Sequence, residues 1–515
     1  MIVIKKSVLK TEIHMQQKVK TNGNSLFYVV SAGVFTVALC NQGSFYGGGI
    51  VFAGLLTAVF LLGKLSFVKA TDAPYLYFCA WYFFCAVKNG FVAEFAAIGL
   101  IPSIAYLFLL MCRADSAHKE KLTALFLRVC IPISVVSIIL WVIMSIEKGF
   151  IARAYFPFFY SNTTGIFFGV CYILASLSGD DVMKKAKYLF IFSLLTTMSV
   201  GAAAITYLAI LATDRNKKRV IIYTAVCIAG AFFMKERLIE SGGTFAERLL
   251  QIHDGIMCAV SNPIFGIGAG RWENAKQIYQ TGFYTAKLIH CSPIQVCAES
   301  GFIGGILLLI SALAAMLRIK GDRKSFVCAV MLFAHSFFDF DLYFAAFGMF
   351  FALLVCPAEN TSIPQRRSAS VAARTLCLSL AVVFTANAVI LASAKRYESA
   401  AKTYGADFAI AEYETTAAMF SSNATEVYAN ALAESGRRDE YIKVYDKIEY
   451  PSPKLTVQRV VLNGKNADEI AALLDEQPFN TEFSEAFGDS EVSEKALVKM
   501  SYFGKKLYEM RGTNE

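Results

Sequence analysis

The chain has 515 residues, of which 56% are hydrophobic and only 17% are charged. Soluble domains usually carry about a quarter charged residues, so this composition indicates an integral membrane protein rather than a soluble one. The formal net charge of +9 does not indicate nucleic-acid binding, because many basic residues lie in short segments between apolar runs, where Lys and Arg set membrane orientation.

Apolar segments recur along the first three quarters of the chain. A membrane-spanning helix needs roughly 20 apolar residues, with a range near 17 to 25. By this measure we expect an all-α, polytopic membrane protein with about 12–13 transmembrane helices, several of them short. The predicted spans are 25–40, 47–65, 73–87, 91–112, 122–146, 156–177, 188–198, 200–212, 220–233, 301–317, 325–337, 342–356 and 373–393.

Groups of basic residues between these spans predict the orientation. Lys and Arg concentrate in cytoplasmic loops, and all the groups share that side if segments 188–212 and 325–356 are helical hairpins. The N-terminus is then cytoplasmic, whereas the loop 235–300 and everything after residue 393 are external. The groups are Lys64 and Lys69; Arg113, Lys119 and Lys121; Lys184, Lys185 and Lys187; Arg215, Lys217, Lys218 and Arg219; Lys320, Arg323 and Lys324; and Arg366 and Arg367.

One polar segment, 244–305, interrupts the apolar pattern. Its first part has helical spacing, and Asn262-Pro263 predicts the helix end, because Pro lacks an amide donor and disfavours helix in the preceding residue. A glycine-rich turn follows, and then a single histidine, His290, before the apolar run from Gly301. A polar segment of this size between spans is where we expect the chemistry of the protein.

The order of motifs in this segment resembles the O-antigen ligase and O-antigen polymerase superfamily, which also includes bacterial oligosaccharyltransferases. The motifs occur in the order Arg, then the sequence NPIFGIGAG, then a single His, then Gln-x-x-x-Glu-x-Gly. Two positions depart: Cys291 stands where the family has Asn, and no Trp follows within the arginine's helix. The residues that fit are Arg248, Pro263, Gly266, Gly268, Gly270, His290, Gln295, Glu299, Gly301 and Gly304.

The resemblance implies a glycosyltransferase-C-like membrane enzyme that moves a glycan from a polyprenyl (undecaprenyl) diphosphate to an acceptor outside the cytoplasmic membrane. The leaving diphosphate needs fixed positive charge, and Arg248 is the first candidate, with Arg153 and Arg271 as helpers. His290 is the candidate base for the acceptor, since an imidazole titrates near neutrality. Alternatively, His290 does not act as a base and only orients the acceptor.

Further residues are expected to bind substrate by the same resemblance. Tyr160-Ser161-Asn162 with Gly165 looks like the family's Y-x-N motif. The sequence HSFFDFD, with His335, Asp339 and Asp341, falls at the outer hairpin turn; Gln295 and Glu299 complete the expected set. Many relatives carry Ser-Arg-Gly at the tip of the first hairpin. This chain has Met198-Ser199-Val200-Gly201 there, so one phosphate contact is missing.

We expect no metal and no other cofactor. The spacing of Asp339 and Asp341 is that of a metal-binding DxD, but relatives with this motif are regarded as metal-independent. The sequence also contains no Walker loop, which agrees with a lipid-linked donor rather than a nucleotide sugar. The 13 cysteines include no CxxC pair and read as small buried apolar residues; a disulfide or reactive thiol at Cys291 and Cys297 is a minor alternative.

The composition changes after residue 393. We therefore expect a transmembrane domain over 1–393 and an external, soluble helical domain over 394–515. Residues 424–453 read as two amphipathic helices about a Ser-Gly turn and are similar to a tetratricopeptide unit, which predicts a protein partner for this domain.

Alternative functions remain open from sequence alone. Within the same chemistry, the acceptor is a saccharide or, in a protein O-oligosaccharyltransferase, a protein. A polysaccharide transporter or flippase is a second alternative, although internal repeats and polar breaks in midplane helices, which are typical of transporters, are not found. A non-catalytic membrane scaffold is the third. No partner of the nucleic-acid class is expected.

Overall fold

The computed structural model describes residues 29–62, 73–113, 119–214, 235–357, 367–464, 467–480 and 498–512, with a few single residues between these ranges. Several predictions lie outside the described residues. They are the span 220–233, apart from residues 221, 224 and 225, and the basic groups at Lys64 and Lys69, at Arg215, Lys217, Lys218 and Arg219, and at Arg366.

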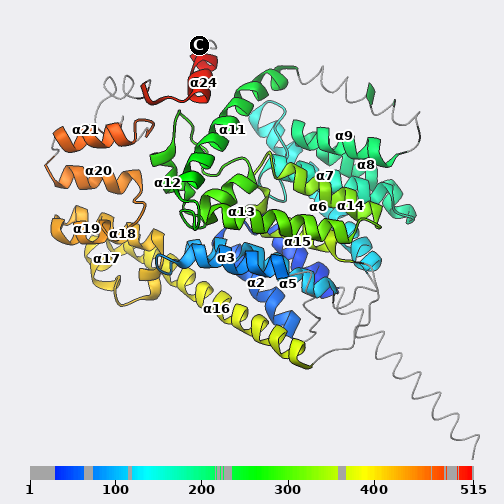
Figure 1. Cartoon of the computed structure of the whole chain (residues 1–515), viewed down its shortest axis with the longest axis horizontal. Helices are drawn as coiled ribbons and strands as arrows, with labels where there is room; N and C mark the ends of the chain where they lie inside the picture. Colours follow the sequence, from blue (N-terminus) through cyan, green and yellow to red (C-terminus); the bar gives the residue numbers. More distant parts are fainter. Residues whose placement is uncertain are drawn as a thin grey trace, which may run out of the picture.

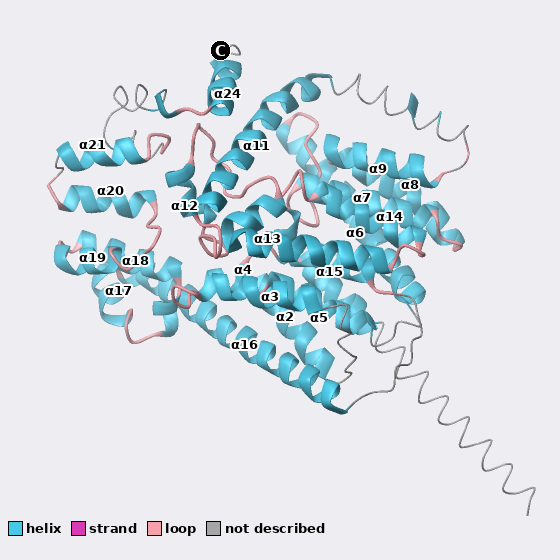
Figure 2. Cartoon of the chain, in the orientation of Figure 1, coloured by secondary structure: helices cyan, strands magenta, loops and turns pink. Residues whose placement is uncertain are grey.

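Every regular element in the described ranges is a helix, and these ranges contain no strand (Figure 2). The all-α prediction is therefore confirmed for them. Before the C-terminal part the helices are Val29–Cys40, η1 (Gln42–Ser44), α2 (Gly47–Leu62), α3 (Ala73–Val87), α4 (Ala93–Gly99), α5 (Ile101–Arg113), α6 (Lys119–Lys148), α7 (Ser161–Ser176), α8 (Asp181–Thr196), α9 (Val200–Thr213), α11 (Lys235–Ser261), α12 (Trp272–Tyr279), α13 (Ser292–Arg318), α14 (Arg323–His335), η4 (Asp341–Tyr343), α15 (Ala345–Val355) and α16 (Arg367–Tyr404).

Side-chain caps fix where several of these helices begin. Asp180 accepts from the backbone N–H of Val182 at the start of α8, at 2.8 Å. Asp322 accepts from the N–H of Ser325 at the start of α14, at 3.2 Å. Such a cap satisfies an N–H group that the first helical turn leaves unpaired, and it contributes about 1 kcal/mol.

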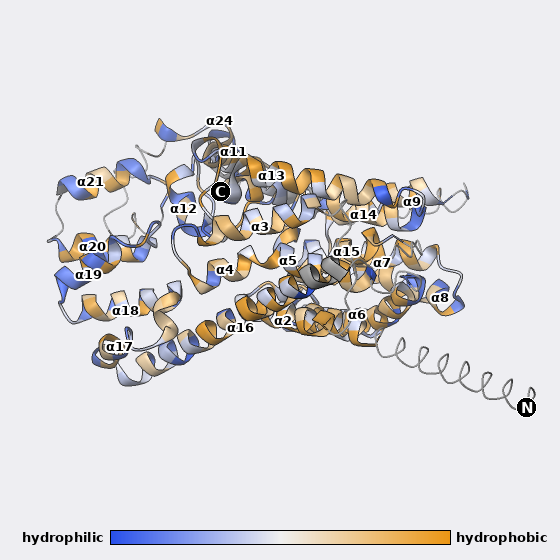
Figure 3. Ribbon diagram, turned by 60° about the horizontal axis from the view of Figure 1, so that its bottom comes forward, coloured by the Kyte–Doolittle hydropathy of each residue, from blue (hydrophilic) through white to orange (hydrophobic). Residues whose placement is uncertain are grey.

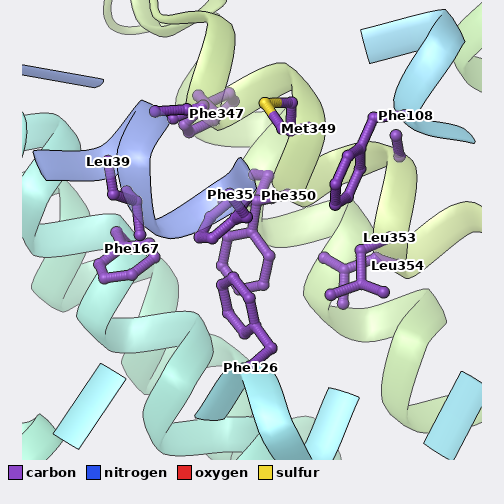
Figure 4. Close-up of a cluster of buried hydrophobic side chains, with 14 of the residues drawn as sticks. Phe35, Leu39, Phe108, Phe126, Phe167, Phe347, Met349, Phe350, Leu353 and Leu354 are labelled. Atoms are coloured by element: carbon purple, nitrogen blue, oxygen red, sulfur yellow. The ribbon is translucent and has the colours of Figure 1, made fainter. Parts of the chain in front are cut away.

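The main core lies where helices distant in sequence meet. Phe35 of the first helix contacts Phe126 of α6 edge to face, with ring centroids 4.3 Å apart, and Phe126 stacks on Phe350 of α15 at 4.8 Å (Figure 4). All three rings are fully buried or nearly so. Between helices in a lipid environment, such close packing rather than the exclusion of water drives association.

Broad apolar faces stay exposed on the long helices. On α13 the exposed side chains include Phe302, Ile306 and Leu313, and on α6 they include Ile139 and Ile143. Figure 3 shows hydrophobic ribbon over α2, α6, α13 and α16 and mostly hydrophilic ribbon at α19. Contiguous apolar surface is unfavourable in water, so these faces indicate a membrane-embedded protein.

Within the described residues, three helices are long and apolar enough to cross a membrane. They are Lys119–Lys148, Ser292–Arg318 and Arg374–Tyr404. A fourth candidate is α4 with α5, which are bent by 41° at Leu100. The predicted span 91–112 is therefore two helices rather than one. Each predicted span within the described ranges overlaps a helix, but several of these helices are only 10–17 residues long.

The C-terminal part is a stack of shorter helices that continues from the end of α16 (Figure 1). The predicted pair about a Ser-Gly turn is present, since α18 ends at Glu434 and Gly436 follows with φ of +68°. The helices are α17 (Ala406–Glu412), η5 (Ala417–Phe420), α18 (Ser422–Glu434), α19 (Arg438–Tyr445), α20 (Pro453–Leu462), α21 (Ala467–Glu476) and α24 (Tyr502–Gly512).

Candidate active site around Arg248 and His290

Arg248 reaches the turn between α14 and α15 from helix α11. Its Nη1 donates a hydrogen bond to the carbonyl of Phe338 at 2.7 Å, and its Nη2 lies 3.5 Å from Oδ2 of Asp339. The Arg248 side chain is 21% exposed, whereas that of Asp339 is 1% exposed. The guanidinium is thus held in place by a buried carboxylate and remains partly accessible, and its buried Nε has no hydrogen-bond partner among the described residues.

Asp339 also joins Arg248 to a second arginine. Its Oδ2 accepts from Nδ2 of Asn162 at 2.9 Å and from the hydroxyl of Tyr160 at 3.1 Å. The carbonyl oxygen of the same Asn162 side chain accepts from Nη2 of Arg153 at 2.7 Å, and Nε of Arg153 donates to the carbonyl of Thr197 at 2.9 Å. The structure therefore brings the predicted residues of three distant segments into one network.

His290 lies beside this network and is oriented by Gln251. Gln251 Nε2 donates to Glu247 Oε1 at 3.1 Å, so its Oε1 is left to accept from His290 Nδ1, at 2.7 Å. Nδ1 therefore carries the hydrogen, and Nε2 keeps the lone pair of the neutral ring. The ring packs edge to face on Phe340, the residue after Asp339, with centroids 5.1 Å apart.

The surroundings of His290 also favour its neutral form. Burial lowers the pKa of His290 below its ordinary value; Asp339 opposes this effect and Arg248 reinforces it. An imidazole that is neutral near pH 7, with Nε2 unprotonated, is suited to accept a proton.

The second carboxylate of the hairpin turn forms a separate, fully buried cluster. Asp341 Oδ2 lies 2.6 Å from His335 Nδ1, and its Oδ1 accepts from the hydroxyl of Thr163 at 2.7 Å. Asp339 and Asp341 thus take different partners rather than facing one another. The described residues hold no group of three His, Cys, Asp or Glu side chains that could bind a metal ion.

Ser292, at the start of α13, fastens His290 to the same turn. Its N–H donates to the carbonyls of Ser336 at 2.8 Å and of Asp339 at 3.0 Å, and its hydroxyl donates to the Asp339 carbonyl at 2.8 Å. The backbone that carries His290 and the backbone that carries Asp339 are therefore one rigid unit. Nearby, Cys291 and Cys297 are free thiols, so the alternative of a disulfide there is not met.

Gln295 and Glu299 hold the glycine turn from inside α13. Both are fully buried. Glu299 accepts from Tyr82 at 2.5 Å, from the N–H of Gly270 at 2.9 Å and from Gln295 at 2.8 Å, and it also accepts from the hydroxyl of Tyr343. These hydrogen bonds connect α13 to α3, to the glycine turn and to η4; the expected contact of Gln295 and Glu299 with substrate stays a prediction.

The glycine turn itself fits against a break in α13. The helix is interrupted at Ser300 and Gly301, where Gly301 has φ of +70°. The carbonyls that the break exposes, of Ala298 and Glu299, accept from the N–H groups of Ile267 and Gly268 at 3.0 and 2.9 Å. A Cβ atom at Gly301 would lie 2.1 Å from the carbonyl oxygen of Ile264, so only glycine permits this approach.

Arg271 takes partners on another side of the loop. Its Nη1 donates to Glu449 of the C-terminal part at 2.5 Å, and its guanidinium lies over the ring of Phe95 at 4.8 Å. None of its described contacts is with the network of Arg248, Arg153 and His290. The expected role of Arg271 as a helper at the phosphate stays a prediction that these contacts do not favour.

Sequence reasoning missed Gln251, Glu247 and Ser292. A signal was available for Gln251, because it lies three residues after Arg248 and so shares a helix face with it. No comparable signal marks Ser292, whose partners are backbone carbonyls some 45 residues away along the chain. Comparison of the chain with protein-family models gives no match, and comparison with curated proteins gives none either.

Proposed function

We propose that the chain is a membrane glycosyltransferase of the O-antigen ligase or polymerase type. It transfers a glycan from a polyprenyl diphosphate carrier to a saccharide acceptor in the assembly of cell-surface polysaccharide. The observation that carries the proposal is that Arg248 and an unprotonated His290 Nε2 flank one hairpin turn, at Asp339 and Phe340. A fixed cation and a base side by side are what displacement of a phosphate leaving group requires.

Two guanidinium groups at the site support an anionic ligand. Arg248 pairs directly with the carboxylate of Asp339, and Arg153 is connected to it through Asn162. Because guanidinium groups stay charged and offer planar pairs of donors, they suit a diphosphate better than an uncharged sugar.

These groups divide the reaction between them. The acceptor hydroxyl attacks the anomeric carbon while His290 Nε2 takes its proton. The bond from that carbon to the diphosphate oxygen breaks, and the bonding electron pair leaves with the oxygen. Arg248, with Arg153 behind it, stabilises the charge that develops there. The imidazolium then returns its proton to solvent, which restores the base.

The membrane arrangement belongs to the same proposal. We infer about 12–13 spans in residues 1–393, a cytoplasmic N-terminus, an external loop 235–300 and an external, tetratricopeptide-like domain from residue 394 onward. The exposed apolar faces of α6 and α13 support the embedding. The polar network lies at the ends of apolar helices, where a lipid-linked donor and a water-soluble acceptor can meet.

The decisive experiment measures transfer by variants of the two central residues in a deletion strain. We expect His290→Ala to reduce glycan transfer by roughly 10²–10⁴-fold, as loss of a general base does. We expect Arg248→Ala to cost about 10²–10³-fold and Arg248→Lys to restore only part of it, since an ammonium cannot form paired hydrogen bonds. Transfer is followed by mass spectrometry of surface glycans and lipid-linked precursors.

A matched control for His290 is available on α11, the helix that carries Arg248. His253 is 30% exposed and pairs with Asp254 rather than with the Arg248 network, so His253→Ala should leave transfer unchanged. Full transfer by His290→Ala would remove its role as the base. Long glycans stranded on lipid in the deletion strain identify a ligase, single repeat units identify a polymerase, and glycan missing from proteins identifies the oligosaccharyltransferase alternative.

A further inference from the structure

A cavity of about 1490 Å³ separates the loop after α11 from the C-terminal helices. Its walls come from the start of α4, from α12 with the loop that follows it, and from α18, α19 and the start of α20. Figure 1 shows α12 lying between these C-terminal helices and the apolar bundle. Pockets for single small ligands measure about 300–1,000 Å³, so this cavity has room for an oligomer.

Polar contacts hold the two walls at a fixed distance. Glu449, just before α20, accepts from Arg271 at 2.5 Å and from Asn89 at 2.6 Å. On the other wall Glu94 accepts from the hydroxyl of Ser421 at 2.6 Å. The Arg271 side chain is largely buried, so its contact with Glu449 is shielded from solvent.

The chemistry of the lining fits a neutral, hydroxyl-rich chain. Six glutamates are balanced by one arginine and four lysines, so the lining has a formal charge of −1 and selects no strongly charged ligand. Six side-chain amides and seven aromatic rings make up much of the remainder. Amides both donate to and accept from hydroxyl groups, and aromatic faces pack against the apolar faces of sugar rings.

We propose that this cavity binds an extended oligosaccharide of uncharged sugars, which is the acceptor glycan of the transfer reaction. The identification of this glycan as the acceptor rests on the proposed function. The proposal that the cavity binds a glycan does not. A peptide fits less well. The described walls consist of helices and loops without a strand, so they offer no strand edge to an extended peptide, and their polar lining is unlike the apolar groove that an amphipathic helix requires.

The cavity leads towards the candidate base. Lys287 forms part of its lining and precedes His290 by three residues. Three residues span at most about 11 Å even when fully extended, so the backbone of Lys287 lies within that distance of the His290 backbone. A glycan held in the cavity can therefore present its terminal sugar near His290 while the C-terminal helices hold the sugars behind it.

The test compares two neighbouring positions on α12. Gln277 lines the cavity, whereas Ile278 is 44% exposed and lies outside the lining. The probe is a ladder of oligosaccharides prepared from the cell-surface polysaccharide of the producing strain, titrated into the full-length protein in detergent. We expect affinity to rise with chain length, Gln277→Trp to weaken the longer oligomers about tenfold, and Ile278→Trp to bind as the wild type. Equal affinities for the two variants, or no binding of any oligomer by the wild type, overturn the proposal.

A crosslinking experiment separates glycan from peptide occupants. With a diazirine-bearing lysine analogue in place of Lys443, which lines the cavity, we expect in living cells an adduct whose mass falls on glycosidase or periodate treatment. An adduct removed by protease instead contradicts the proposal.

Kinetics separate this inference from the proposed function. The Gln277→Trp enzyme should still transfer to the shortest acceptor and lose its preference for longer ones, whereas Arg248→Ala loses transfer to all acceptors. If the wild-type protein binds glycans but does not transfer them, the glycan-binding site is supported and the proposed enzymatic function is contradicted. If both proteins transfer glycan and Gln277→Trp shows the same preference for acceptor length as the wild type, the proposed glycan-binding site is contradicted. The proposed enzymatic function then stands.

Discussion

Gln251 decides which nitrogen of His290 is available as a base. Its amide is fixed at one end by Glu247, so its oxygen must face the imidazole. A histidine without such a partner would sample both neutral tautomers, and only the one with a free Nε2 lone pair could act towards the network of Arg248. Gln251 therefore sets which nitrogen of His290 the proposed reaction can use.

This arrangement predicts the pH dependence of transfer. Burial lowers the pKa of His290, so the base form is present at neutral pH and is lost only as the pH falls through a pKa below about 6.5. Gln251→Glu places a carboxylate beside the ring, which favours the imidazolium and should move the acid limb of the pH–rate profile upward by about one pH unit or more. The measurement is the initial rate of transfer between pH 4.5 and 9.

Gln251→Ala provides the comparison for this shift. It removes the hydrogen bond without adding charge, so the rate should fall while the acid limb stays at or below its wild-type position. If the profile of Gln251→Glu coincides with that of the wild type, His290 does not titrate in the rate-limiting step.

Single residues of the site were only partly predictable from sequence. Arg153, Asn162 and Asp339 were expected at the site, and the structure connects them to Arg248. Arg271 shares the charge and the loop with Arg248, yet it pairs with Glu449 in a part of the chain more than 170 residues away. Which of two arginines in one loop meets the other candidates depends on tertiary packing, which residue type and spacing do not contain.

At the scale of elements, the break in α13 organises the loop. A helix of 27 residues normally satisfies its own carbonyls, but the interruption at Ser300 and Gly301 frees two of them for the glycine turn. The predicted span starts at Gly301 because the preceding turns contain Gln295 and Glu299. The helix instead begins at Ser292, because a hydroxyl donor of Tyr82 and the backbone N–H of Gly270, both from other segments, satisfy the buried Glu299. Apolar periodicity does not report such partners.

The close fit at the break predicts a large effect of Gly301→Ala. The backbone there has φ of +70°, and the added Cβ would lie 2.1 Å from the carbonyl oxygen of Ile264. We expect the free energy of unfolding to fall by roughly 2 kcal/mol or more, because the cost of a strained backbone conformation and the cost of a clash with main-chain atoms add. The measurement is thermal unfolding of the purified protein in detergent, followed by intrinsic fluorescence.

Gly33 offers the matched control for this substitution. It lies in the first described helix, and a Cβ added there would meet no atom within 4 Å. Gly33→Ala should therefore leave stability unchanged or raise it by up to about 1 kcal/mol. Equal unfolding temperatures for the two variants would show that the turn does not depend on the contact between residues 264 and 301.

At the scale of the whole molecule, the change in composition at residue 393 is a change in packing rather than a break in the chain. Helix α16 runs without interruption to Tyr404. Phe384 belongs to the main core, whereas Ala394 and Tyr397 belong to the core of the C-terminal helices. The change in composition lies between Phe384 of one core and Ala394 of the other, but the sequence does not reveal that one helix passes through both. A continuous helix fixes the C-terminal helices relative to the bundle.

That rigid connection makes the membrane topology testable at two exposed positions. Ser435 lies in the turn between α18 and α19, and Lys184 lies on α8 with its side chain 52% exposed. In a background where the exposed Cys40 is replaced by Ser, we expect Ser435→Cys to react with a membrane-impermeant maleimide in intact cells. Lys184→Cys should react only after permeabilisation, because its basic group is predicted to be cytoplasmic. The parent protein without either substitution gives the background. Labelling of both sites in intact cells would place the cavity and the Arg248 network on opposite sides of the bilayer, which no transfer mechanism at Arg248 could accommodate. Labelling of position 184 alone would place both on the cytoplasmic side and overturn the predicted topology.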